Sequence, residues 1–464
     1  MKKLNLSGKD IRRIGITDDK VISLAKNIMQ KHYKHQNKAE ALEILKKVMN
    51  NPEKFHKHPQ LGKIAQRLTV NKTQSTQEFM LKETKPYKIY GRENIEESAL
   101  QQMETAMRLP IAIKGALMPD AHQGYGLPIG GVIAAKNAVI PFAVGMDIGC
   151  RMAMSIFPID PNFVINNVPR LKNILLSNTS FGKEEHKEMK DHLIMERQEF
   201  NEIKFLRTLQ KKAYDQLGTS GHGNHFVDIG ILEVKEPTTP IQISPGIYLA
   251  VLTHSGSRGT GAEIARHYTK IASQKCSLPK GAKSLAWLEL GKAEGEEYWK
   301  AMNWAGDYSA ANHEIIHKKI AKAMQAESLA RIENHHNFAW KEKLSDGEEI
   351  VIHRKGATPA HKGTLGIIPG SMVSPAFIVR GKGNEEALNS AAHGAGRLLS
   401  RSEAKRRFTK KELHEYLNKN NVTLIGGNKD ESPFAYKDIN EVMRLQQDMV
   451  DILAVFKPKI VRMA

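Results

Sequence analysis

Short apolar runs separated by glycine-rich turns, from about residue 85 to the end, constrain this fold more than any other feature of the chain. Examples are residues 131–135 and 247–252, which have the length and β-branched content of strands. Charged stretches at about 183–216 and 290–330 predict helices between them. We therefore predict a mixed α/β (α+β) fold, with one large domain over residues 85–464.

Residues 1–75 are predicted to form a small basic helical extension. Apolar residues recur with helical spacing over 21–28 and again over 41–48. The prolines and the glycine between 52 and 62 are expected to end the second helix, and the polar segment 71–77 is expected to be a linker.

The charge of the chain predicts a polyanionic partner. Lys and Arg number 69 against 50 Asp and Glu, a net charge of +19. Residues 1–84 alone hold 18 basic and 8 acidic residues, so about half of the excess lies there. RNA or DNA is the expected partner, and a generally basic surface without a defined ligand is the alternative.

The chain has the features of a cytoplasmic protein. Cys150 and Cys276 lie far apart in different contexts, which argues against a disulfide framework and for a reducing compartment. The start of the chain meets charged residues before any long apolar stretch, so no signal peptide is expected. No apolar run approaches the roughly 20 residues of a membrane helix.

His393 is the residue that most directly suggests chemistry. It opens the glycine-rich segment 393–397, so its imidazole is a candidate nucleophile with space beside it for a phosphate. The basic segment 401–407 follows closely and is expected to steer a phosphate backbone towards it.

Four short clusters upstream carry candidate metal ligands, at 147–150, 224–225, 254–259 and 335–337. Each alone has an ordinary explanation, such as a buried structural cysteine, a polar turn or a core histidine. Together they predict a site for one or two transition ions, built from one Cys, one Asp and three His. A strand ending in a tight turn is expected to present Asp147 and Cys150, and residues 255–259 are expected to cradle a phosphate.

The turn at 369–374 offers backbone donors and hydroxyls that suit a nucleotide. A phosphate-binding Gly-x-x-x-x-Gly-Lys loop, a dinucleotide fingerprint, a Gly-x-Ser-x-Gly elbow and a Lys-x-Asp-Gly nucleophile are all missing from the sequence. The residues therefore favour metal-assisted phosphoryl or nucleotidyl transfer with a histidine nucleophile.

As a set, these segments closely resemble the RtcB family of RNA ligases. The matching motifs keep the family's order over about residues 90–464, as MPDAHQG at 118–124, VGMDIGC at 144–150, GTSGHGNHF at 218–226, HSGSRG at 254–259, HN at 336–337, RKGA at 354–357, IPGSM at 368–372 and HGAGR at 393–397.

The resemblance implies roles for particular residues. His393 would be the catalytic nucleophile. Two Mn²⁺ ions, bridged by Cys150, would be bound by Asp147, Cys150, His225, His254 and His336. GTP would be bound by Asn224, His225, Phe226, Val227, Asp228, His336, Asn337, Pro369, Gly370, Ser371, Met372, Ser374, His393, Gly394, Ala395 and Gly396.

The resemblance also implies a reaction. The family joins RNA ending in a 2′,3′-cyclic phosphate or 3′-phosphate to RNA with a 5′-hydroxyl, through a histidine–GMP intermediate, in RNA repair or tRNA splicing. The expected partners are RNA, such as tRNA halves, together with GTP and an activating partner protein, and no membrane is involved.

Two positions depart from the family pattern. Asp228 stands where a Glu is usual, and the chain ends Arg462-Met463-Ala464 where Val-Lys-Gly is usual, so Met463 replaces the lysine. Arg462 is a candidate to substitute for it from the neighbouring position. The alternatives to a GTP-dependent ligase are a paralogue that uses another nucleotide or caps RNA ends, and a non-catalytic RNA-binding protein.

Overall fold

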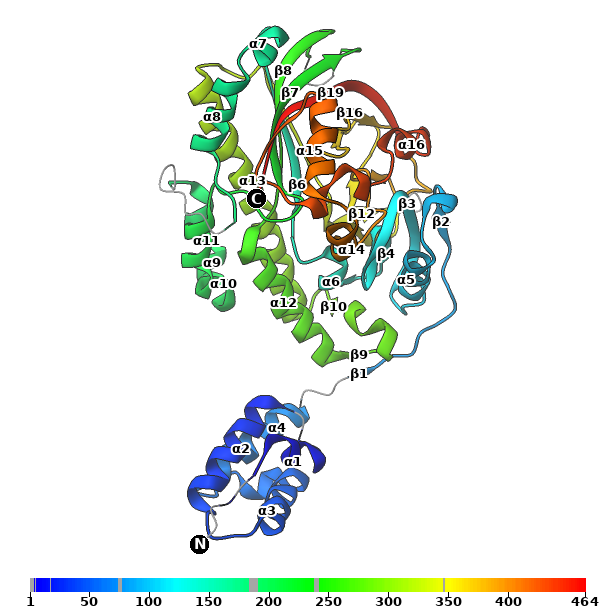
Figure 1. Ribbon diagram of the computed structural model, residues 1–464. Helices are drawn as coiled ribbons and strands as arrows, with labels where there is room; N and C mark the ends of the chain where they lie inside the picture. Colours follow the sequence, from blue (N-terminus) through cyan, green and yellow to red (C-terminus); the bar gives the residue numbers. More distant parts are fainter. Residues whose placement is uncertain are drawn as a thin grey trace. The chain divides into compact units, whose positions relative to one another are not determined.

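The computed structural model describes residues 4, 6–16, 18–73, 77–182, 191–237, 242–344 and 347–464 (Figure 1). The chain divides into two compact units, residues 1–77 and residues 78–464. Each unit has a hydrophobic core of its own.

The first unit is helical, and its helices bury the apolar positions that recur with helical spacing. Its elements are α1 (Gly8–Arg13), α2 (Asp19–His32), α3 (Lys38–Asn50), a 3₁₀ turn (Pro52–Phe55) and α4 (Gly62–Thr73). Asp18 and Asn37 cap α2 and α3 by accepting backbone hydrogen bonds. The sequence did not predict α4, which forms because Ile64 and Ala65 are buried in the core of this unit. The predicted linker is therefore wrong for residues 71–73, and residues 74–76 lie outside the described part of the chain.

An eight-stranded sheet forms the centre of the second unit, in the order β11-β6-β8-β7-β19-β16-β15, with β18 parallel to β19. Its strands are β6 (Arg151–Phe157), β7 (Phe226–Val234), β8 (Gly246–Ser255), β11 (Ala330–His335), β15 (Leu365–Ile368), β16 (Ala376–Gly381), β18 (Thr423–Ile425) and β19 (Val450–Met463). The sheet curls until β11 and β15 approach each other. The Asn334 side chain on β11 accepts a hydrogen bond from the backbone N–H of Ile367 on β15 at 2.9 Å and donates one to the carbonyl of Ile367 at 3.3 Å.

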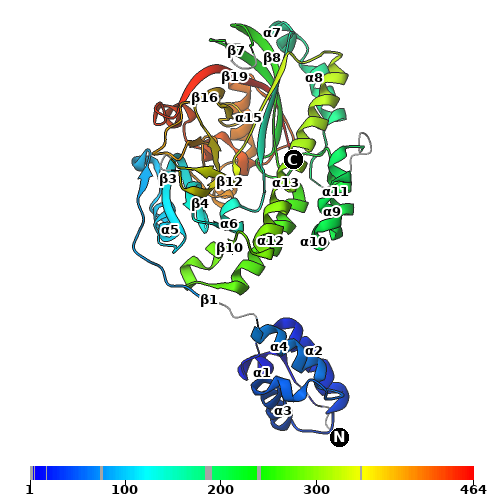
Figure 2. The same cartoon turned by 180° about the vertical axis from the view of Figure 1, so that it is seen from behind.

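Helices cover both faces of this sheet (Figure 2). Helices α8 (Val168–Asn178) and α13 (Ala293–Met324) pack on the face that includes Val227 and Val251. Helix α15 (Lys410–Lys419) packs on the other side, close to Met463.

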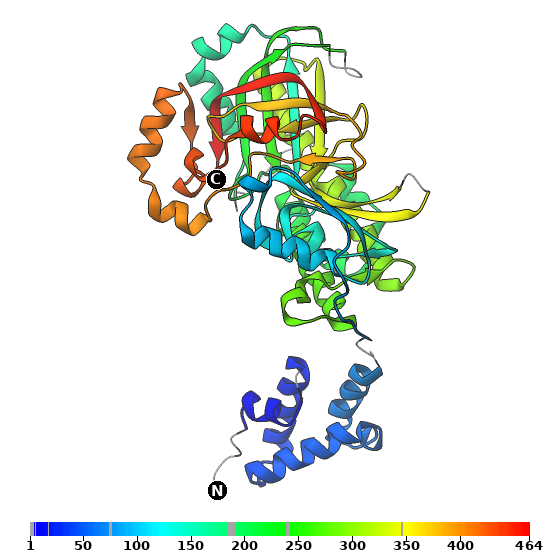
Figure 3. The ribbon, with the colours of Figure 1, turned by 90° about the vertical axis from the view of Figure 1, so that its right-hand side faces the viewer.

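A five-stranded sheet lies beside the first one, in the order β12-β13-β4-β3-β2, with α5 (Glu97–Met107) packed against it (Figure 3). Its strands are β2 (Tyr87–Ile89), β3 (Ala112–Tyr125), β4 (Leu127–Ala135), β12 (Asn337–Lys343) and β13 (Glu349–Lys355). Because β11 ends at His335 and β12 begins at Asn337, His336 lies where the chain passes from one sheet to the other.

Shorter elements complete the second unit. The other described helices are α6 (Pro141–Val144), α7 (Pro161–Asn166), α9 (Glu199–Glu202), α10 (Lys204–Thr208), α11 (Gln210–Gln216), α12 (Arg258–Lys275), α14 (Arg401–Arg407) and α16 (Ile439–Arg444). The other strands are β1 (Gln77–Glu78), β5 (Ala138–Val139), β9 (Cys276–Ser277), β10 (Leu288–Glu289), β14 (Ala357–Pro359) and β17 (Ser390–Ala392).

The mixed α/β prediction is confirmed, and the predicted strands at 131–135 and 247–252 lie in β4 and β8. The strand predicted before Asp147 is wrong: only β5 is extended there, because Pro141 begins the short helix α6. Part of the predicted helical stretch, residues 183–190, lies outside the described residues. No helix among the described residues is long and apolar enough to cross a membrane. Cys150 and Cys276 are buried and unbridged.

Candidate metal centre and nucleotide cavity

Strand ends bring four of the predicted metal ligands together. Cys150 precedes β6, His225 precedes β7, His254 lies near the end of β8 and His336 follows β11. β8 pairs antiparallel with both β6 and β7, and β11 pairs antiparallel with β6. Two carboxyl-terminal and two amino-terminal strand ends therefore meet at one end of the sheet.

The donor atoms of these side chains face one another. Sγ of Cys150 lies 3.5 Å from Nε2 of His225 and 3.1 Å from Nε2 of His254. Nε2 of His254 lies 3.2 Å from Nε2 of His336, and Oδ2 of Asp147 lies 2.9 Å from Nε2 of His225. All of these residues except the half-buried Asp147 are buried. Donor atoms converging in this way, on one small volume, are what a bound metal ion requires.

The protonation state of His254 suits a metal ligand. Its Nδ1 donates to the backbone carbonyl of Asn224 at 3.0 Å, so the lone pair of the neutral ring is on Nε2, which faces Cys150. Burial lowers the pKa of His254 to about 3, which keeps the ring neutral. Metal-bound imidazoles commonly donate their second N–H to a carbonyl in this way.

Two glycines allow Asp147 and His225 to reach the cluster. A Cβ at Gly256 would lie 2.1 Å from Oδ1 of Asp147, and a Cβ at Gly221 would lie 1.6 Å from Nδ1 of His225. Burial alone would raise the pKa of Asp147, but the hydrogen bond and charge of His225 outweigh it and lower that pKa. The backbone N–H of Ser257 also donates to Oδ1 of Asp147, at 3.1 Å.

His393 is held by a buried carboxylate. Its Nδ1 lies 2.6 Å from Oδ2 of Asp120, and its backbone N–H donates to the same oxygen at 3.2 Å. The side chain of Asp120 has 0% exposed surface. Because the carboxylate accepts, Nδ1 carries the proton and Nε2 has the lone pair. The centroid of this ring lies 5.0 Å from that of His336, so the imidazole is close to the ligand cluster.

A cavity of about 410 Å³ contains both groups. It is lined by all five predicted metal ligands, by His393 and by every predicted nucleotide-binding residue except Val227. Val227 is fully buried on the opposite face of the sheet, in the core beneath α8 and α13. Successive residues of a strand alternate between faces, so Phe226 and Asp228 take the cavity side.

Side-chain hydrogen bonds hold two of the segments that line the cavity. In the turn at 369–374 the hydroxyls of Ser371 and Ser374 lie 2.8 Å apart. Oδ1 of Asn337 accepts from the N–H of Gly356 at 2.8 Å, and its Nδ2 donates to the carbonyl of Asp147 at 3.4 Å. The Asn337 amide therefore connects the loop that carries Asp147 to the turn at Gly356, which lies beside His393.

The phosphate cradle predicted at 255–259 is wrong, because this segment lies behind Asp147 and does not line the cavity. The N–H of Gly259 is used by the side chain of Gln216, at 3.0 Å. The Arg258 guanidinium is buried and donates to Thr219 and to a backbone carbonyl, at 3.2 Å and 3.1 Å.

The end of the chain also differs from expectation. Met463 lines the cavity, whereas the Arg462 guanidinium lies on the other face of β19, over the Phe181 ring, and donates to the carbonyl of Leu175. Arg462 therefore does not substitute for the lysine of the family pattern. Asp228 does line the cavity, and burial raises its pKa well above the ordinary value.

Sequence reasoning assigned no role to several cavity residues. Asp120 was visible only as part of the MPDAHQG motif, although it contacts His393 directly. Lys355, in the RKGA motif, is buried with its pKa lowered to about 7 by burial, and donates to the carbonyl of Tyr125 at 2.6 Å. Glu431 and Tyr436 line the cavity beside Arg397, and no sequence signal indicated them.

Comparison with known proteins identifies the family. A family model described as "tRNA-splicing ligase RtcB" matches residues 102–464. The chain belongs to the RtcB family. The RNA-splicing ligase RtcB of Escherichia coli strain K12 is 33% identical over 414 residues, which cover 81% of this chain and 97% of that protein. The tRNA-splicing ligase RtcB of Nanoarchaeum equitans is 30% identical over 451 residues, which cover 80% of this chain and 94% of that protein.

Membership in the RtcB family makes this chain an RNA ligase with RNA substrates. The buried cluster of Cys150, His225 and His254 has the donor set of a metal site. The family match begins at residue 102, so the helical unit of residues 1–77 lies outside it.

Proposed function

We propose that this RtcB protein joins RNA ending in a 2′,3′-cyclic phosphate or 3′-phosphate to RNA with a 5′-hydroxyl, using GTP and Mn²⁺, in RNA repair or tRNA splicing. The reaction proceeds through a covalent His393–GMP intermediate. The observation that carries the proposal is the 2.6 Å contact between His393 and Asp120, in the cavity that also holds the metal-ligand cluster. Nucleotidyl transfer to histidine needs this combination of an oriented nucleophile and charge-neutralising metal ions.

His393 acts first, as a nucleophile. Its Nε2 lone pair forms a bond to the α-phosphorus of GTP, and the bond from that phosphorus to the pyrophosphate oxygen breaks, releasing pyrophosphate. The imidazole becomes cationic as the N–P bond forms. The Asp120 carboxylate, which accepts the Nδ1 proton in a hydrogen bond, stabilises that charge.

A set of one carboxylate, three imidazoles and one thiolate suits a first-row transition ion such as Mn²⁺, Fe²⁺, Co²⁺ or Zn²⁺, and Mn²⁺ is the ion that the family resemblance implies. Two ions would be held by Asp147, Cys150, His225, His254 and His336. When bound, they would polarise the α-phosphate and neutralise its charge. Burial raises the pKa of the Cys150 thiol, so binding the metal requires this thiol to release its proton.

The guanine nucleotide would occupy the rest of the cavity. Its proposed contacts, besides His225, His336 and His393, are Asn224, Phe226, Asp228, Asn337, Pro369, Gly370, Ser371, Met372, Ser374, Gly394, Ala395 and Gly396, all of which line it. Val227 is left out because it is buried on the other side of β7.

RNA joining follows in two transfers, after water has opened any 2′,3′-cyclic phosphate to a 3′-phosphate and a 2′-hydroxyl. An oxygen of the RNA 3′-phosphate attacks the GMP phosphorus, and the bond from that phosphorus to Nε2 of His393 breaks. The 5′-hydroxyl of the second RNA then loses its proton and attacks the 3′-phosphorus, and the bond from that phosphorus to the GMP oxygen breaks, releasing GMP. Arg401 of α14 lines the cavity, and Arg406 and Arg407 of the same helix are exposed. Basic side chains at this position would hold the RNA backbone without reading its bases.

The test is incubation of the purified chain with Mn²⁺ and α-³²P-labelled GTP, with labelled ATP in parallel, followed by acid-lability and peptide mapping. Acid-labile label from GTP on His393, and none in His393→Ala, is the expected result. No adduct from either nucleotide in metal-loaded protein would overturn the proposal and favour an enzyme that depends on an activating partner, or a non-catalytic RNA-binding protein.

A second candidate function is an RtcB paralogue with different nucleotide use or RNA-end capping activity. The observation that favours it is Met463, an apolar side chain lining the cavity where the family pattern has a lysine. Label from ATP alone, or guanylylated RNA that is never joined, would support this candidate.

A further inference from the structure

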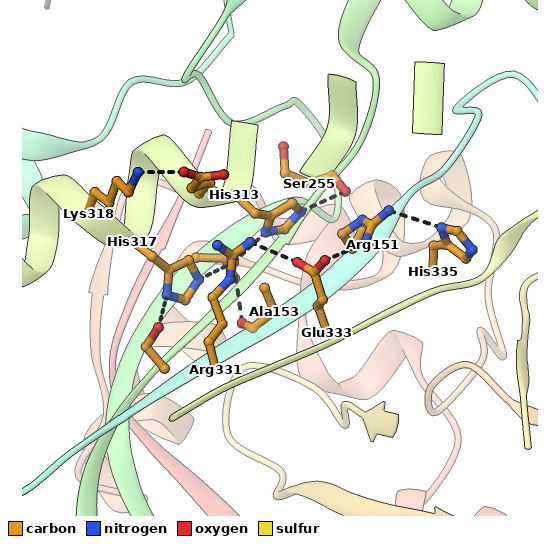
Figure 4. Close-up of polar contacts among 12 residues, drawn as sticks. Arg151, Ala153, Ser255, His313, His317, Lys318, Arg331, Glu333 and His335 are labelled. Carbon is orange, nitrogen blue, oxygen red and sulfur yellow. Dashed lines mark hydrogen bonds and ion pairs between the residues drawn. The ribbon is translucent and has the colours of Figure 1, made fainter. Parts of the chain in front are cut away.

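A layer of polar side chains lies between the eight-stranded sheet and α13 (Figure 4). It is on the face of the sheet opposite the metal-ligand cluster. This polar layer consists of Arg151 and Ser155 on β6, Thr253 on β8, Glu333 and His335 on β11, and His313 and His317 on α13. Residues alternate along β8, so Thr253 and Ser255 face α13 whereas His254 faces the cavity. None of these polar-layer residues lines the cavity.

A continuous chain of hydrogen bonds crosses the polar layer, and one end fixes its direction. The Ser255 carbonyl can only accept, so Nε2–H of His313 donates to it, at 3.2 Å. Nδ1 of the neutral His313 ring then accepts from the Thr253 hydroxyl at 2.6 Å. The Thr253 oxygen accepts from Nε2–H of His317 at 2.8 Å, and Nδ1 of His317 accepts from the Ser155 hydroxyl at 2.8 Å. Every ring nitrogen of both histidines is satisfied.

Both histidines are suited to this neutral, directional arrangement. His313 has 0% exposed surface and His317 has 4%, so a charged ring would lose almost all of its hydration. Burial lowers the pKa of His313 well below its ordinary value and that of His317 to about 3. Removing one member of the chain would leave buried donors or acceptors without partners.

Arg151 makes a second set of contacts, which joins β6 to β11 and to α13. Its guanidinium donates to Glu333 at 2.8 Å and to Nδ1 of His335 at 3.1 Å. The same guanidinium donates to the carbonyl of Gly306, on α13, at 3.3 Å.

On each of the strands β11, β6 and β8, a residue of the polar layer is next in sequence to a proposed metal ligand. Strand register places His335 opposite Arg151 and Arg151 opposite Ser255, in one row across β11, β6 and β8. The ligands next to these residues in sequence are His336, Cys150 and His254. The hydrogen bonds of the layer therefore hold a residue directly adjacent in sequence to each of these three ligands.

We propose that the polar layer is a positioning network for the metal centre, with Thr253, His313 and His317 as its central members. It fixes the position of β8 against α13, so that Nε2 of His254 faces Cys150 and His336 before metal arrives. The inference rests on the proposed function, because it presupposes a metal bound by these ligands. Its members are positioning residues, since they act through the ligands.

The test compares Co²⁺ binding and Co²⁺ visible absorption in four full-length proteins. Thr253→Val keeps nearly the same shape and removes both the donor and the acceptor at the centre of the hydrogen-bonded chain. It is expected to weaken Co²⁺ binding by about 10- to 100-fold, the usual effect of losing a group that orients a ligand, and to shift the absorption bands. Thr253→Ser keeps the hydroxyl and is expected to restore wild-type affinity and spectrum.

Ser309→Ala is the matched control, because Ser309 is a fully buried residue of α13 whose hydroxyl makes no hydrogen bond among the described residues. It is expected to bind Co²⁺ as the wild type does. If Thr253→Val does not fold, Ser155→Ala replaces it, because Ser155 lies at the far end of the hydrogen-bonded chain. Co²⁺ binding is again expected to weaken. Thermal unfolding of each protein accompanies the titrations.

Wild-type affinity and spectrum in Thr253→Val, or in Ser155→Ala where that replaces it, would overturn the inference while leaving the proposed function intact. Equal weakening in Ser309→Ala would also overturn it, since general destabilisation would then explain the loss. A wild-type protein that binds no Co²⁺ would instead overturn the metal centre of the proposed function, and the inference with it.

Discussion

Nδ1 of His393 lies 2.6 Å from Oδ2 of Asp120, although 273 positions separate the two residues in the sequence. Asp120 lies in β3 and His393 directly follows β17. The contact determines which imidazole nitrogen carries the proton, and therefore which one has the lone pair for the proposed attack.

Asp120→Asn is expected to slow formation of the His393 adduct by about 100- to 10,000-fold. The amide oxygen still accepts from Nδ1–H, but the negative charge that stabilises the cationic imidazole is lost. The rate of labelling by α-³²P-GTP measures the effect, and Co²⁺ titration serves as the control because no proposed ligand changes. A labelling rate equal to that of the wild type would show that the Asp120 charge has no part in the transfer.

Cys150→Ser is expected to weaken metal binding by more than about 100-fold, because a serine hydroxyl is a poor ligand in place of a thiolate. This loss exceeds the usual effect of removing a residue that only hydrogen-bonds to a metal ligand. Chelation of metal from the wild type should likewise stop labelling of His393. Cys276→Ser is the matched control, since Cys276 is also buried but lies on β9 and does not line the cavity. Equal metal affinity in the two variants would exclude Cys150 as a ligand.

The candidate site could be predicted from the sequence where a side chain able to bind metal stands beside an apolar run that forms a strand. Cys150, His225, His254 and His336 each flank or end an apolar run, and the ends of adjacent antiparallel strands meet in space. The apolar run at residues 247–252 likewise predicted β8, which carries His254 near its end. The family motifs then supplied the order in which these segments occur.

Other features depend on contacts between distant segments and could not be predicted. The Asp120–His393 pair needs β3 and the loop after β17 to meet, and no local pattern reports that. The side taken by Val227 and by Arg462 depends on the strand register, and a shift of one residue exchanges the two faces. Segment 138–145 is apolar as a strand would be, yet Pro141 begins a helix there.

Asp228→Asn is expected to stabilise the metal-free protein increasingly as the pH rises above about 4. Burial raises the pKa of Asp228 well above its ordinary value of 3.8. The folded state thus keeps a proton that the unfolded state releases. As the pH rises, the free energy of unfolding of the wild type falls by up to about 1.4 kcal/mol per pH unit, until the pH passes the pKa of Asp228 in the folded state. Asparagine imitates the protonated form and removes this loss.

Thermal unfolding of wild type and Asp228→Asn at about pH 5 and about pH 8 measures the difference, which should grow with pH. Asp228→Glu keeps a titrating carboxyl at this position and serves as the control. A difference that is constant or shrinks with pH would mean that Asp228 is ionised in the folded protein.

Met463→Lys is expected to strengthen GTP binding by about 10-fold or more, because a charged hydrogen bond to phosphate contributes about 1.5–3 kcal/mol. The side chain at 463 lines the cavity, so a lysine there is within the nucleotide site. The GTP concentration for half-maximal labelling of His393 gives the measurement. Arg462→Met is the control: it removes the buried hydrogen bond to Leu175, and should lower thermal stability without changing GTP affinity. Unchanged affinity in Met463→Lys would place the nucleotide phosphates elsewhere.

Deletion of residues 1–77 is expected to weaken RNA binding and to flatten its dependence on salt, while His393 labelling by GTP stays unchanged. The deleted unit is strongly basic: Lys31, Lys34 and Lys38 are exposed near the junction of α2 and α3. Each cation that contacts a phosphate adds about 0.7 to 0.9 to the slope of log affinity against log salt. The cavity residues all belong to residues 78–464, so the adduct chemistry does not need the first unit.

Lys31→Glu combined with Lys34→Glu separates the effect of charge from that of truncation, since α2 and α3 remain in place. Gel-shift titrations at two salt concentrations give affinity and slope for the full chain, the truncated chain and this double variant. The double variant should fall between the other two, because it removes part of the positive charge and adds repulsion towards phosphate. An unchanged slope in the truncated chain would mean that the first unit does not contact RNA, and that its charge serves another polyanion.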